Sequence, residues 1–98
     1  MRYFTLNEFD SPDVPGSGQS MDSGFLELLD EARKIAGIPF VINSGYRTKK
    51  HNSAVGGKLD SAHMDGMAAD IKCEDSHSRF IIDGALRKVG FARIGVES

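Results

Sequence analysis

The stretch that decides the fold runs from Ser44-Gly-Tyr-Arg47 through Ser61-Ala-His63 to Ala69-Asp70-Ile71. It places glycines, polar groups and two histidines between two short apolar runs. Residues 44–62 show no clear period, which predicts a long loop, and loops of this length in a compact domain tend to be functional. Asn43 or Asn52 could tie this loop down through side-chain-to-backbone hydrogen bonds.

The apolar runs on either side of the loop predict strands. Phe40–Asn43 follows a proline and is rich in β-branched and aromatic residues, and Met67–Cys73 has the same character. In the second run, alternation puts Met67, Ala69, Ile71 and Cys73 on one face, which we expect to be core. A third strand is predicted over residues 91–96.

Two helices are predicted from an apolar period of 3.6 residues. The first is followed by Gly37 and Pro39, and Asp22 or Ser23 can cap its start. The second begins with Ser76 as its cap and ends at Gly90. Their apolar faces are formed by Phe25, Leu28, Leu29, Ala32, Ile35 and Ala36 in the first and by Ile82, Ala85, Leu86 and Val89 in the second. The order of elements predicts an α+β fold, a small and mostly antiparallel sheet with two main helices packed on it.

Composition narrows the class of protein. A chain of 98 residues forms one domain, and a net charge of −2 with scattered Lys and Arg argues against a nucleic-acid or anionic-membrane surface. The apolar runs are too short for a membrane span, and the first residues lack a signal peptide, so we expect synthesis in the cytoplasm. With Cys73 as the one cysteine, no internal disulfide can form.

The candidate functional residues are Asp70, His63 and Arg47. Asp70 faces away from the predicted core among small apolar neighbours, so its carboxylate is exposed, paired or bound to a metal. His63 precedes it across Gly66, and a His and an Asp joined by a glycine turn can supply half of a zinc site. A solvated histidine fits the same spacing. Arg47 suits bidentate capture of a carboxylate or a surface ion pair.

The combined pattern resembles the M15 peptidase family of zinc D-Ala-D-Ala carboxypeptidases and murein endopeptidases, most closely its small phage and prophage branch. The family is related in fold to the hedgehog signalling domain. The likeness covers nearly the whole chain. Its motifs are Phe4-x-Leu6-x-Glu8-Phe9-Asp10, Ser44-Gly-Tyr-Arg-Thr48, His51-Asn52, Val55-Gly-Gly57 and Ser61-x-His63-x-x-Gly66-x-Ala68-Ala69-Asp70-Ile71.

This resemblance implies roles at the matching positions. His63 and Asp70 would bind Zn²⁺, Arg47 would hold a substrate carbonyl or carboxylate, and Ser61 would hydrogen-bond substrate. A metal-activated water would attack peptidoglycan stem peptides at the cell wall, within a hedgehog-like fold whose long loop lines the active site. The family's third ligand is a His on a strand after the second helix, and Phe91–Ser98 ends before such a residue. Glu97 is a candidate general base.

The incomplete ligand set leaves several functions open. We expect a single M15-like domain over residues 1–98, shortened at its C-terminus, that binds zinc weakly. The first hypothesis is a zinc peptidase, a D,D-carboxypeptidase or an endolysin-type endopeptidase. The second is a non-catalytic relative that binds zinc or the cell wall, and the third is a structural component of a phage particle. His51 and His77 have no place in the implied ligand set.

Overall fold

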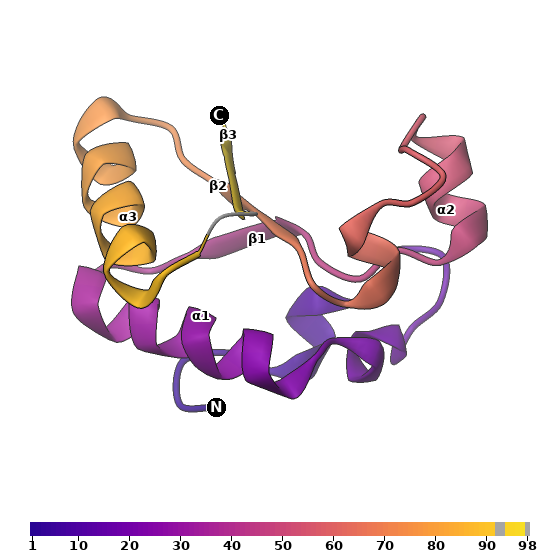
Figure 1. Ribbon diagram of the computed structural model, residues 1–98, viewed down its shortest axis with the longest axis horizontal. Coiled ribbons are helices and arrows are strands. Elements are labelled where there is room, and N and C mark those ends of the chain that lie inside the picture. The colour runs from indigo at the N-terminus through magenta and orange to yellow at the C-terminus, as the bar shows by residue number, and fades with distance from the viewer. Residues whose placement is uncertain (92–93, 98) are drawn as a thin grey trace.

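The computed structural model describes residues 1–91 and the backbone of residues 94–97 (Figure 1). The two long helices, α1 and α3, and a small sheet form one side of the molecule, and the shorter helices form the other. The elements in chain order are η1 (Leu6–Phe9), η2 (Ser17–Ser20), α1 (Ser23–Ala36), β1 (Val41–Ser44), α2 (Lys49–Ala54), η3 (Ala62–Asp65), β2 (Ala69–Lys72), α3 (Ser76–Val89) and β3 (Ile94–Glu97).

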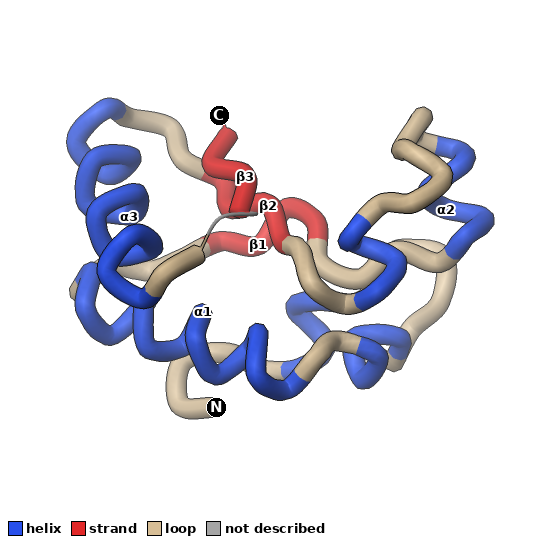
Figure 2. Tube along the Cα trace, viewed as in Figure 1, coloured by secondary structure: helices blue, strands red, loops and turns tan. Residues whose placement is uncertain are grey.

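The sheet has the strand order β1-β2-β3 and lies at the centre of the molecule (Figure 2). β1 and β2 are antiparallel, and their register shifts between Ile42 and Ser44, so that Ser44 lies opposite Asp70. β3 is parallel to β2, as expected for two strands joined by the crossover helix α3. The predicted α+β class is confirmed. The parallel β3 makes the sheet mixed, with its antiparallel part in the β1–β2 pair.

Helix α1 has the caps that the sequence indicated. The Asp22 carboxylate accepts a hydrogen bond from the Phe25 N–H at 2.9 Å, and Gly37 ends the helix with φ 69°. The apolar face differs in part from the predicted one. Leu26 is buried, whereas Leu28 and Ile35 are 45% and 42% exposed. The helix is therefore rotated so that its side toward Leu26 packs on the core.

The N-cap residue of helix α3 lies one position earlier than predicted. Asp75, not Ser76, is the N-cap, and its carboxylate accepts a hydrogen bond from the Ser78 N–H at 2.7 Å. The hydrogen bonds from the N–H and the hydroxyl of Ser78 lower the pKa of the Asp75 carboxyl. Gly90 ends the helix with φ 86°, as expected.

The core lies between α1, α3 and one face of the sheet. Most of its predicted members in the second strand and second helix are buried, namely Ala69, Ile71, Cys73, Ile82, Ala85 and Leu86, and Val89 is partly buried. Met67 is the exception: it is 43% exposed because β2 begins only at Ala69 and the preceding turn carries Met67 outward. The buried apolar side chains are Phe4, Phe9, Met21, Phe25, Leu26, Leu29, Ala32, Phe40, Ala69, Ile71, Cys73, Ile82, Ala85 and Leu86.

The segment between β1 and β2 contains more helix than the sequence suggested. It was predicted as a loop, but α2 and the single turn η3 lie within it. Thr48 caps α2, since its hydroxyl accepts a hydrogen bond from the His51 N–H at 3.1 Å. A helix of six residues is too short to show an apolar period, so the pattern could not reveal it. No helix in the described ranges has the length and hydropathy needed to span a bilayer.

Candidate metal and substrate site

Asp70 is placed by the end of the antiparallel pair. It lies in β2 opposite Ser44, the last residue of β1. Its neighbours Ala68 and Ala69 are buried, while the Asp70 side chain is 20% exposed. The strand therefore presents one carboxylate at the point where the Ser44–Arg47 segment leaves the sheet.

His63 is carried by η3, and Ser61 stabilises this turn. The Ser61 hydroxyl accepts a hydrogen bond from the His63 N–H at 3.2 Å, and Gly66 ends the turn with φ 71°. The His63 carbonyl accepts a hydrogen bond from the Arg47 N–H at 3.1 Å. The backbone at His63 is thus bound directly to the backbone at Arg47.

The imidazole of His63 is fixed from one side and faces Asp70 from the other. Its Nδ1 lies 2.7 Å from the carbonyl oxygen of Gly45. A carbonyl oxygen only accepts hydrogen bonds, so Nδ1 carries the proton and, in the neutral ring, Nε2 keeps its lone pair. Nε2 lies 3.5 Å from Asp70 Oδ2. This backbone contact is the kind that orients a histidine for metal binding.

The separation of these two facing atoms suits a tetrahedral metal ion. Two ligand atoms at about 2.0–2.2 Å from zinc lie about 3.3–3.6 Å apart, which includes the distance between Nε2 and Oδ2. The His63 and Asp70 side chains are 12% and 20% exposed, so both are partly open to solvent. The two residues therefore fit zinc as two of its ligands.

The guanidinium of Arg47 lies against the same carboxylate oxygen. Arg47 Nη2 is 3.6 Å from Asp70 Oδ2. Its Nε donates a hydrogen bond to the Ser44 hydroxyl at 3.2 Å, and Nη1 donates to Asn52 Oδ1 at 3.5 Å. Three residues from β1, α2 and β2 thus hold the guanidinium beside the His63–Asp70 pair.

Asn52 contributes more to this arrangement than the sequence indicated. It is 2% exposed, and its amide nitrogen donates a hydrogen bond to the Lys58 carbonyl at 2.7 Å, which confirms the predicted tie to the loop. Its contact with Arg47 was not foreseen. The adjacent His51-Asn52 and Val55-Gly-Gly57 motifs are the sequence signal for this buried anchor.

Gly45 lets two backbone segments meet beneath His63. A Cβ atom at this position would lie 2.7 Å from Phe9 Cα and 2.8 Å from Phe9 Cβ. The close approach also allows the Tyr46 N–H to donate to the Phe9 carbonyl at 2.8 Å. A side chain at Gly45 would therefore force either Phe9 or the Gly45 backbone, whose carbonyl orients His63, to shift.

We expect Gly45→Ala to lower stability by about 1–3 kcal/mol, the usual cost of forcing extra atoms into a packed site. For a domain of this size, thermal unfolding should show a fall in Tm of several degrees or more, roughly 4–8 °C per kcal/mol. Gly84→Ala is the matched control, because a Cβ there meets nothing within 4 Å inside α3. The control should be neutral or stabilising; an equal loss in both variants would contradict the role of the Phe9 contact.

The remaining candidate residues lie apart from the pair. His51 is in α2, and His77 is in the first turn of α3, two residues after Asp75. The backbone of Glu97 pairs with Lys72, whereas Gly95 lies opposite Asp70. The side chain of Glu97, the predicted general base, lies outside the described part of the structure.

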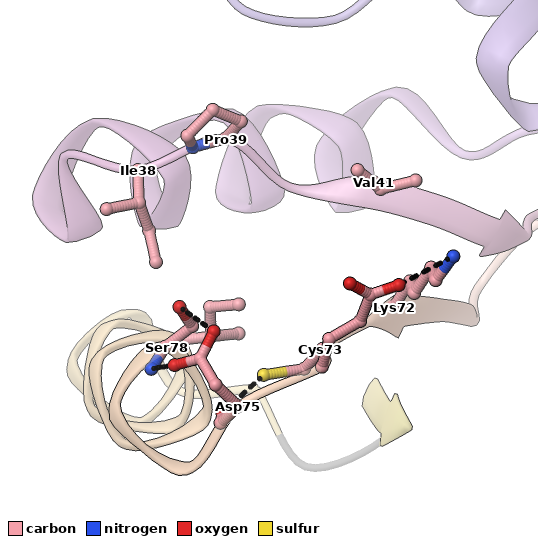
Figure 3. A pocket seen from close by; sticks show the side chains of 9 residues that line it. Ile38, Pro39, Val41, Lys72, Cys73, Asp75 and Ser78 are labelled. Atoms are coloured by element: carbon pink, nitrogen blue, oxygen red, sulfur yellow. Dashed lines mark hydrogen bonds and ion pairs between the residues drawn. The ribbon is translucent and has the colours of Figure 1, made fainter. Parts of the chain in front are cut away.

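A pocket of about 430 Å³ lies at the other end of β2, between β1 and the start of α3 (Figure 3). Ile38, Pro39 and Val41 form one wall, and Figure 3 shows Asp75 and Ser78 on the opposite side. The buried Cys73 thiol donates to the Asp75 carbonyl at 3.2 Å, which confirms that this cysteine packs in the core. The pocket contains none of the residues that surround Asp70.

A family model described as Peptidase M15 matches residues 3–98. The chain therefore belongs to the M15 peptidase family, whose members are hydrolases and generally depend on zinc. Comparison with curated proteins gives no match, and comparison with solved structures gives none either. Among the side chains that the structure describes, no three of His, Cys, Asp or Glu gather closely enough to hold a metal.

Proposed function

We propose that this protein is a zinc-dependent peptidase that cleaves peptidoglycan stem peptides, as a D,D-carboxypeptidase or an endolysin-type endopeptidase. The observation that carries the proposal is the convergence of three groups on one point. His63 Nε2 lies 3.5 Å and Arg47 Nη2 lies 3.6 Å from the same oxygen of Asp70. Family membership supplies the reaction class.

In this proposal each residue has a distinct task. His63 and Asp70 are zinc ligands, and the Gly45 carbonyl keeps the proton on Nδ1 so that Nε2 is available. Zinc at such a site supplies Lewis-acid chemistry, polarising a substrate carbonyl and lowering the pKa of water. Arg47 holds a substrate carbonyl or carboxylate through its fork of N–H donors. Ser61 caps the turn that bears His63 and contributes a hydroxyl near the substrate.

The alternative proposal is a non-catalytic relative that binds zinc or the cell wall. Its support is the ligand count, since His63 and Asp70 form a pair and the described residues hold no group of three. Catalytic zinc sites usually have three protein ligands. We therefore expect the 98-residue chain to bind zinc more weakly than a three-ligand site does.

Digestion of purified murein, followed by mass spectrometry of the released peptides, tests both proposals. The chain is assayed with zinc in excess, so that a weak site is filled, and again after metal removal with a chelator. Zinc-dependent loss of terminal D-Ala or breakage of cross-links supports the peptidase. Co-sedimentation with murein, or zinc retention, without cleavage supports the binding module. Absence of zinc binding, murein binding and cleavage would contradict both.

A further inference from the structure

The N-terminal segment lies alongside the segment that bears Arg47. The Tyr46 N–H donates to the Phe9 carbonyl at 2.8 Å, and the Thr48 N–H donates to the Ser11 hydroxyl at 3.2 Å. These bonds fix the backbone immediately before and after Arg47. Ser11 is 1% exposed, so this contact is buried at its N-terminal side.

Asp13 is the residue that joins these two segments through side chains. One oxygen of its carboxylate accepts a hydrogen bond from the Thr48 hydroxyl at 2.7 Å, and the other accepts one from the Ser11 hydroxyl. The hydrogen bonds from Ser11 and then Thr48 lower the pKa of the Asp13 carboxyl below its ordinary value. The carboxylate is therefore ionised at neutral pH and accepts both bonds as a charged group, the stronger kind.

A continuous path leads from Thr48 to the guanidinium of Arg47. The Thr48 hydroxyl accepts a hydrogen bond from the His51 N–H, and the Thr48 carbonyl accepts one from the Asn52 N–H at 2.9 Å. Asn52 in turn accepts the bond from Arg47 Nη1. The orientation of Thr48 thus sets the first turn of α2, and that turn sets the amide that meets Arg47.

We propose that Asp13 is a positioning residue for Arg47, which acts through Thr48, the first turn of α2 and Asn52. It touches neither His63 nor Asp70 in any contact described above, so its removal should displace the guanidinium and leave the ligand pair in place. The catalytic consequence rests on the proposed peptidase function. The structural consequence does not, because it concerns contacts within this chain.

Hydrogen exchange measured by NMR tests the structural part without any substrate. In Asp13→Ala, exchange of the His51 amide and of the Arg47 Nη1 protons, which face Asn52, should become faster by roughly 10-fold, since one charged hydrogen-bond partner is lost. Exchange at Ile71 in β2 should stay unchanged. Asp10→Ala is the matched control: Asp10 accepts from Gly16 and Gly18 in the same loop and does not bind Thr48.

Thr48→Ser and Thr48→Val provide a conservative and a disruptive change at the other end of the contact. Serine keeps the hydroxyl and should retain wild-type exchange, whereas valine should behave like Asp13→Ala. Unchanged exchange at His51 and Arg47 in Asp13→Ala, or equal acceleration in the Asp10 control, would overturn the proposal.

Kinetics test the catalytic part in the murein assay. Asp13→Ala should lower kcat/KM by about 10-fold, while zinc affinity measured by titration stays at the wild-type value. A parallel loss of zinc affinity would overturn the assignment of Asp13 to Arg47. If the wild-type chain cleaves nothing, the proposed function fails, and the exchange data still decide whether Asp13 positions Arg47.

Discussion

Replacement of His63 by alanine is expected to lower zinc affinity by roughly 100-fold or more and to reduce murein cleavage to background, because it removes one of two protein ligands. His63 Nε2 faces Asp70 at 3.5 Å, and its Nδ1 proton is held by the Gly45 carbonyl, so Nε2 is the atom available to the metal. Zinc affinity is measured by competition titration with a chelating dye. Thermal unfolding of the metal-free variant checks that the fold is retained.

The other two histidines are matched controls for this change. His77 is exposed in the first turn of α3, and His51 lies in α2 toward Asp13. Alanine at either position should leave zinc affinity and cleavage within about twofold of the wild type, since neither side chain is a ligand in the proposed site. Zinc binding that survives in His63→Ala but is lost in His51→Ala would show that the wrong histidine has been assigned.

Replacement of Arg47 by alanine is expected to separate catalysis from metal binding. Cleavage should fall by about 100- to 1,000-fold, the usual effect of removing a donor that stabilises developing charge on a substrate oxygen. Zinc affinity should be unchanged or higher, because the variant lacks a cation 3.6 Å from the ligand oxygen of Asp70. The two quantities are measured on the same preparation, by murein digestion and by zinc titration.

Two further variants determine which property of Arg47 matters. Arg47→Lys keeps the charge but lacks the planar fork of donors, so it should restore little of the lost activity. Arg87→Ala removes an exposed arginine from the last turn of α3 and should have no effect on cleavage. Loss of zinc affinity in Arg47→Ala would mean that this residue supports the ligands rather than the substrate.

Most of the fold followed from features that are local in the sequence. α1 and α3 have complete apolar periods with an acidic cap before them and a glycine after them, and both were predicted with nearly correct ends. The start of β2 was placed too early, because the alternation already includes Met67, two residues before the strand geometry begins at Ala69. α2 was missed, since a short helix is fixed by its capping contacts rather than by its pattern.

The candidate site, like the fold, could be predicted from the sequence only where the signal is local. The motif placed His63 and Asp70 together, and the structure brings them within 3.5 Å, although their role as ligands stays a prediction. What the sequence could not reveal are contacts between distant segments. The Gly45 carbonyl that orients His63 is 18 residues away, and the Ser11 hydroxyl that binds Thr48 is 37 residues away. No periodicity or spacing rule reports such pairs.

The contact between Phe9–Asp13 and Tyr46–Thr48 also determines when the site can form during folding. The hydrogen bonds within α1 and α3 join residues about four apart, whereas the bond from Thr48 to Ser11 spans 37 residues. Interactions that close long segments of chain are entropically costly and are made after local structure. A chain with its helices formed but its first residues unpaired would thus carry His63, Asp70 and Arg47 without holding them together. Assembly of the reactive groups is coupled to completion of the fold.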